Sequence, residues 1–94
     1  MDNFYKSLDP STNIETYNFD DPDSMDFDSF VKFVSLAKIE KSVTMPLYCF
    51  KTHNTIGSSV IGLEGVDVII VEGLMSLYCD DAIKLYDLKI FIDV

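Results

Sequence analysis

The sequence predicts an α/β fold in which a βαβ unit follows an N-terminal loop, a helix and a small β arm. Continuous β-branched runs at 67–73 and 88–93 are typical of buried parallel strands. Residues 74–87 between them are long enough for the helical crossover that parallel strands require. The 94 residues, 48% hydrophobic and 24% charged, indicate one small globular domain.

The front of the chain combines a polar loop with one amphipathic helix. Residues 9–17 carry turn-forming side chains without a sustained period, which predicts an exposed loop anchored by Phe19. Residues 20–23 favour a helix start, and Asp26 is placed to cap a helix over about 27–38. Its apolar stripe consists of Phe27, Phe30, Val34 and Ala37, with Phe33 beside them.

The middle of the chain predicts a small extended arm. Residues 42–45 and 47–50 are rich in strand formers, and Pro46 between them favours a sheet edge or a bend. Residues 51–66 contain three glycines and predict a mobile loop with one short strand around 59–61.

Charge and composition restrict the partners. The chain has seven basic residues, all lysine, against 16 acidic residues, giving a formal charge of −9. This balance argues against nucleic acid and leaves neutral, hydroxyl-rich ligands acceptable. Cys49, Cys79 and the single histidine, His53, form no zinc-ligand pattern. Neither a membrane-spanning run nor a secretory signal is visible, so we expect no membrane partner and a cytoplasmic location.

No familiar catalytic motif is present within these residues. The sequence contains no GxxxxGK[ST] phosphate loop, GxSxG elbow or GxGxxG fingerprint. Any catalysis would therefore rest on carboxylates. Glu72 and Asp93 end the two predicted parallel strands, at the sheet edge where α/β proteins bind ligands, although these residues alone favour a solvated strand terminus for either one.

Four segments in order carry a family resemblance. Residues 1–5, 18–23, 46–53 and 71–73, read as MDNFY, NFDDPD, PLYCFKTH and VEG, resemble successive segments of uridine/cytidine kinases in the phosphoribulokinase family. The resemblance implies transfer of the ATP γ-phosphate to the 5′-hydroxyl of uridine or cytidine, with Mg²⁺. It also implies that the βαβ unit is part of a P-loop kinase-type parallel sheet.

The resemblance covers an internal part of the family pattern. The family carries a strand and a phosphate loop ahead of the position matching Met1, and an arginine-bearing lid beyond Val94. The chain is then a single partial domain with a nucleoside-binding part at 1–50, a loop at 51–66 and the βαβ unit at 67–94. The family strand that would separate the two predicted strands is absent. Either the two strands pair directly as a right-handed βαβ unit, or they face a gap that further chain segments or another subunit would fill.

The resemblance assigns roles around the sugar. Asp2 matches the catalytic aspartate beside the 5′-hydroxyl, with a solvated chain terminus as its alternative. Tyr5 matches a tyrosine lining the nucleoside pocket, with a surface aromatic as its alternative, and Phe19 would back the pocket. Asp20 matches the carboxylate that binds the ribose hydroxyls, and helix capping is its other possible role.

The resemblance also assigns residues that would recognise the base and the metal ion. Tyr48, Phe50 and His53 match the residues that recognise the pyrimidine, and Glu72 matches an acid facing the magnesium and phosphate region. Two positions depart from the family pattern: Cys49 replaces an acid between the two aromatics, and Thr55 replaces a basic residue after the histidine. The alternative function is a non-catalytic remnant or an interaction module without kinase turnover.

Overall fold

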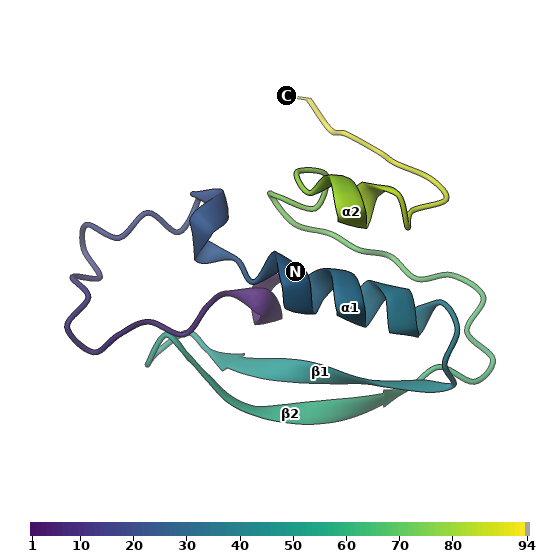
Figure 1. The fold of residues 1–94 in the computed structure, drawn as a ribbon, viewed down its shortest axis with the longest axis horizontal. Coiled ribbons are helices and arrows are strands. Elements are labelled where there is room, and N and C mark those ends of the chain that lie inside the picture. Colours follow the sequence, from purple (N-terminus) through teal and green to yellow (C-terminus); the bar gives the residue numbers. More distant parts are fainter. Residues whose placement is uncertain (94) are drawn as a thin grey trace.

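A computed structural model describes residues 1–93 as three successive layers. A two-stranded hairpin forms the first layer, α1 the second and α2 the third (Figure 1). Helix α1 contacts both β1 and α2, so it joins the layers. In chain order the elements are the 3₁₀ turns η1 (Asp2–Phe4) and η2 (Pro22–Ser24), α1 (Phe27–Ala37), β1 (Ser42–Cys49), β2 (Asn54–Gly62) and α2 (Asp80–Ile83).

Helix α1 begins where the sequence predicts. The Asp26 side chain accepts hydrogen bonds from the Ser29 amide at 3.1 Å and from the Ser29 hydroxyl at 2.6 Å. These bonds satisfy a backbone donor that the first turn leaves without a helical partner. Phe30, Val34 and Ala37 are buried along one face. The predicted helix, its N-cap and its apolar stripe are therefore confirmed.

Strands β1 and β2 form an antiparallel hairpin that is longer than predicted. Pairing runs from Ser42 opposite Gly62 to Cys49 opposite Asn54. Pro46 lies inside β1, where a two-stranded sheet tolerates a residue without an amide donor. The strand expected around 59–61 is part of β2, but the loop predicted for the rest of 51–66 is wrong over 54–62, because β1 supplies a pairing edge even for the weak strand formers at 57–59.

The polar loop between the two 3₁₀ turns is exposed, as predicted, and is organised by local side-chain bonds. At each of four positions a side-chain oxygen accepts a hydrogen bond from the amide two residues later. Such Asx turns order a chain without periodic packing. The four acceptors are Asp9, Asn13, Asn18 and Asp21.

The predicted βαβ unit does not form within residues 1–93. Residues 67–73 and 88–93 pair with no strand there, and the expected crossover contains only the four-residue helix α2. Val68 and Ile70 are 72% and 84% exposed rather than buried. A strand needs a neighbour to satisfy its backbone groups, and the described residues supply none to either segment. Val94, the last residue of the predicted unit, lies outside the described residues.

The core is built around Phe4. Its ring centroid lies 5.3 Å from that of Phe30 and 5.3 Å from that of Phe33, both on α1. The Phe4 carbonyl accepts a hydrogen bond from the Asp26 amide at 2.8 Å, which fixes η1 against the start of the helix. The buried cluster comprises Phe4, Met25, Phe30, Val34, Met75 and Ala82.

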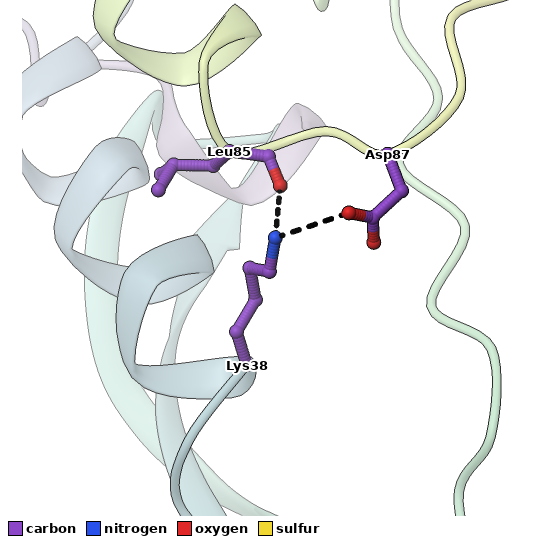
Figure 2. Close-up of polar contacts among 3 residues, drawn as sticks. All are labelled: Lys38, Leu85 and Asp87. Atoms are coloured by element: carbon purple, nitrogen blue, oxygen red, sulfur yellow. Dashed lines mark hydrogen bonds and ion pairs between the residues drawn. The ribbon is translucent and has the colours of Figure 1, made fainter.

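Lys38 connects the end of α1 to the chain that follows α2. Figure 2 shows its ammonium group donating to the Leu85 carbonyl at 2.6 Å and lying 3.6 Å from the Asp87 carboxylate. The Asp87 side chain is almost fully exposed, so the carbonyl contact is the more specific of the two. Across residues 1–93, every helix is too short or too polar to cross a membrane.

Candidate functional site

A pocket of about 260 Å³ opens beside η1 and the end of β1. Its walls come from three places that are distant in sequence: the first turn of the chain, the polar loop, and the tip of the hairpin. Hydrogen bonds join the first turn to the hairpin tip across this region. The lining residues are Asp2, Tyr5, Phe19, Tyr48, Phe50 and His53.

Aromatic rings form most of the pocket wall. The Phe19 ring lies 5.3 Å from the His53 imidazole at an interplanar angle of 30°, and 6.0 Å from Tyr5 in an edge-to-face arrangement. Tyr5 also lies 5.8 Å from Tyr48. Tyr17, which the sequence reasoning did not select, supports Phe19 from a centroid distance of 4.7 Å. These contacts fix flat surfaces that suit stacking with a planar ring.

Backbone geometry holds His53 at the hairpin tip. His53 has a φ of 57°, in the left-handed region that few residues other than glycine occupy. Its amide donates to the Cys49 carbonyl at 2.8 Å, and its carbonyl accepts from the Leu8 amide at 3.0 Å. The next contact is the Thr55 amide, which donates to the Ser7 hydroxyl at 2.9 Å. The tip is thus attached to the chain that leaves η1.

The carboxylates of Asp2 and Asp20 both affect the pKa of Tyr5. Burial raises the pKa of Tyr5, and the negative charges of Asp2 and Asp20 raise this pKa further. Asp20 does not line the pocket but directly follows Phe19, which does, and its charge contributes to the raised pKa of Tyr5. Burial likewise raises the pKa of Tyr48, with smaller effects from neighbouring phenols. Both tyrosines therefore remain neutral hydrogen-bond donors at neutral pH.

Asp20 does not cap a helix in the structure, although the sequence left that role open for it. The residue that caps η2 is Asp21, whose side chain accepts from the Asp23 amide at 2.9 Å. Asp20 uses its own amide to bond the Asn18 side chain at 3.0 Å. Its carboxylate is exposed and is not the helix cap.

Cys49 is the last residue of β1 and lies between the pocket residues Tyr48 and Phe50 in the sequence. Hydrogen bonds from the Thr52 hydroxyl and from the Thr52 and Lys51 amides lower the pKa of its thiol. The side chain is half-buried and forms no disulfide.

Glu72 lies apart from the pocket. Its backbone carbonyl accepts a hydrogen bond from the Met1 amine at 2.9 Å, while its side chain is exposed. Met1 also packs closely on Gly73, where an added Cβ would lie 3.0 Å from the Met1 Cβ. Within residues 1–93, no three His, Cys, Asp or Glu side chains gather where they could hold a metal ion. Glu72 thus offers one carboxylate, and Mg²⁺ would take its other ligands from substrate phosphates and water.

The structure brings together six of the eight residues selected from the sequence. Asp20 lies near this group, and Glu72 is separate. Two residues outside the family motifs contact this region: Ser7 bonds the Thr55 amide, and Tyr17 packs on Phe19. Tyr17 lies two residues before Phe19 and could have been found as its neighbour. Ser7 carries no signal in the sequence, because its role depends on a contact 48 residues away.

Comparison with known proteins gives a consistent result along the whole chain. The model of the Phosphoribulokinase / Uridine kinase family matches residues 1–94. Uridine-cytidine kinase A of Dictyostelium discoideum is 44% identical over 99% of the chain and 18% of its own length. Uridine kinases of Saccharomyces cerevisiae and Borrelia duttonii are 33% and 39% identical over 99% of the chain, covering 19% and 45% of those proteins. The chain thus spans less than half the length of these relatives.

Proposed function

Because the chain belongs to the phosphoribulokinase/uridine kinase family, we propose that it carries the nucleoside-binding part of a uridine/cytidine kinase. The observation that supports this proposal is the pocket itself. Residues from 1–5, 18–23 and 46–53, which the family pattern links to the nucleoside, meet around one cavity. Its ligand would be uridine or cytidine.

The proposed roles follow from the chemistry of the lining groups. Tyr48 and Phe50, with centroids 5.2 Å apart, would contact the flat pyrimidine, and the His53 imidazole would bond its polar edge. The charge of −9 suits this ligand, because an uncharged nucleoside meets no long-range repulsion.

The carboxylates would hold the sugar. The ionised Asp20 side chain can accept hydrogen bonds from both hydroxyls of a ribose diol. Asp2 would orient the 5′-hydroxyl and accept its proton during phosphoryl transfer. Asp2 lines the pocket and Asp20 directly follows the lining residue Phe19, which supports placing both carboxylates within reach of one small ligand.

The phosphate donor would be ATP with Mg²⁺, which supplies the phosphoryl group and screens its charge. The described residues do not form a site for this pair, since Glu72 stands alone and the sequence contains no phosphate loop. We therefore assign nucleoside binding to this chain. Turnover requires residues beyond these 94, and the isolated chain should form no nucleoside monophosphate from ATP.

The exposed apolar segments support a second element of the proposal. Val68, Ile70 and Phe91 lie in extended segments whose side chains are 72%, 84% and 79% exposed. We propose that a β-strand from the remainder of a kinase polypeptide, on the same chain or on another subunit, pairs with these segments. Hydrogen exchange at 67–71 should be fast in the isolated chain and slow after co-expression with such a strand. Fast exchange in both samples would contradict the pairing.

Interaction without catalysis is the second candidate function, and the same exposed segments favour it. The two candidates differ at the pocket, because an interaction module has no requirement for nucleoside. Titration of the isotope-labelled chain with uridine, followed by NMR, separates them. Binding at millimolar uridine should shift the amide signals of the lining residues, and unchanged spectra would overturn the nucleoside proposal.

Matched variants make this titration specific. Asp20→Asn should weaken uridine binding and abolish the preference for uridine over 2′-deoxyuridine, because the variant has lost the carboxylate that accepts from the diol. Asp67→Asn removes the same charge from an exposed residue that does not line the pocket, and it should bind like the parent chain. Equal effects of the two substitutions would show that net charge, not diol recognition, controls affinity.

A further inference from the structure

We propose that Ser7 is a positioning residue whose hydroxyl sets the placement of His53 and the hairpin tip at the pocket. The inference rests on the proposed nucleoside site and adds a residue that the family motifs do not include. Ser7 does not line the pocket. Its hydroxyl bonds the backbone of the hairpin tip, and it would affect the pocket only through that backbone.

Two hydrogen bonds join the chain after η1 to the hairpin tip. The Ser7 hydroxyl oxygen accepts from the Thr55 amide at 2.9 Å, and the Leu8 amide donates to the His53 carbonyl at 3.0 Å. Together they hold the main chain on both sides of Asn54. With the longer bond of 3.5 Å from the Tyr48 hydroxyl to the Lys6 carbonyl, they connect the part of the chain that bears Tyr5 to the end of the hairpin that bears His53.

The strand register explains why the tip needs this connection. Pairing shifts between Leu47 and Tyr48, so that Leu47 faces Gly57 while Tyr48 faces Thr55. Ile56 is the extra residue on β2, and such a bulge interrupts the regular ladder of hydrogen bonds. The Thr55 amide bonds Ser7 at this interruption. A side chain outside the sheet thus supports the irregular end of the hairpin.

The backbone conformation of His53 depends on the hydrogen bonds around it. Its φ of 57° is disfavoured for a side-chain-bearing residue, so the surrounding contacts must hold the conformation. The contacts to Cys49 and Leu8 are main-chain bonds and survive any side-chain substitution. The Ser7 hydroxyl is therefore the contact in this set that a single substitution can remove.

Small displacements of the tip matter for a base-recognition group. Hydrogen bonds weaken steeply outside a narrow range of distance and angle, and a binding group must be held to within about 0.5 Å. Three of the six lining residues, Tyr48, Phe50 and His53, belong to the end of β1 or the turn. Releasing the tip would displace the base-recognising wall and leave the sugar-binding wall at η1 in place.

The first test uses the free chain and needs no ligand. Ser7→Ala should speed hydrogen exchange at the Thr55 amide and move the His53 ring signals, while exchange within α1 stays unchanged. Ser7→Thr retains the acceptor and should restore slow exchange. Ser11→Ala is the matched control, because Ser11 is an exposed serine of the neighbouring loop whose hydroxyl bonds only Asp9 in the described structure. Unchanged Thr55 exchange in Ser7→Ala would overturn the inference.

The second test uses uridine titration with a double-mutant cycle. Loss of one hydrogen bond should weaken uridine binding by Ser7→Ala roughly 2- to 10-fold, while Ser7→Thr binds like the parent. In a His53→Asn background the Ser7→Ala substitution should have a smaller effect than in the parent chain, because part of its effect acts through His53. Full additivity would overturn the positioning role. Absence of uridine binding by the parent chain would instead refute the proposed function, and the exchange test would still decide whether Ser7 holds the tip.

Discussion

Replacing Phe4 by leucine tests the structural centre of the molecule. Phe4 is 4% exposed, and its ring contacts two phenylalanines of α1 at 5.3 Å each. Each aromatic pair contributes about 0.5–1.5 kcal/mol beyond the burial of its area. Leucine keeps a large apolar side chain but loses both pairs. We expect the free energy of unfolding to fall by about 1–3 kcal/mol, or roughly 4–8 °C in Tm for each kcal/mol.

Urea unfolding followed by circular dichroism measures this change. The slope of the unfolding free energy against urea should stay constant, so that the midpoint alone reports the loss of stability. Phe91→Leu provides the same substitution at a side chain that is 79% exposed, and it should change stability by less than about 0.5 kcal/mol. If Phe4→Leu were as mild as Phe91→Leu, the assignment of Phe4 to the core would be refuted.

Three further perturbations address the helix start, the inter-element contact and the pH dependence. Asp26→Ala removes the bonds to Ser29 and should cost about 0.5–2 kcal/mol in urea unfolding. Lys38→Met removes the donor to the Leu85 carbonyl at a partly exposed site and should cost less than about 1 kcal/mol. Burial raises the pKa of Tyr48, so its stabilising contribution is complete below about pH 10 and is lost as pH rises through the folded-state pKa. Tyr48→Phe should flatten this alkaline decline in the unfolding midpoint.

Each of these perturbations has its own control. Asp26→Ser retains a capping oxygen and should recover most of the stability, whereas equal losses for alanine and serine would contradict the capping role. Lys84→Met affects an exposed ion pair of 3.9 Å and should be silent, so a loss matching that of Lys38→Met would contradict the specific contact. An unchanged alkaline slope in Tyr48→Phe would show that other groups cause the decline.

Local physics explains which parts of the fold the sequence predicts. The start of α1 depends on Asp26 and Ser29, three residues apart, and its stripe depends on spacings of three and four, so both are visible in sequence. Strand β2 depends on its partner instead. Its Gly-Ser-Ser segment at 57–59 has weak strand propensity, yet it pairs because β1 presents matching backbone groups.

In the C-terminal part of the chain, the hydrophobic pattern predicts strands that do not form among the residues described by the structure. Residues 67–73 have the composition of a buried parallel strand, but composition does not supply the neighbour that such a strand requires. Residues that the family motifs select from distant parts of the sequence do meet around one pocket. The family motifs pointed to the six lining residues, whereas the support from Ser7 depends on three-dimensional contacts that no motif records.

The 3₁₀ turn η1 has a consequence for finding ligands. Phe4 in this turn is part of the core, while Asp2 in the same turn and Tyr5 directly after it line the pocket. Occupancy and folding are therefore thermodynamically linked: a ligand that binds only the folded chain stabilises it by about 2.7 kcal/mol at 100 times its Kd. Melting temperature thus becomes a screen that requires no turnover, and it can rank pyrimidine, purine and deoxy nucleosides on the chain alone.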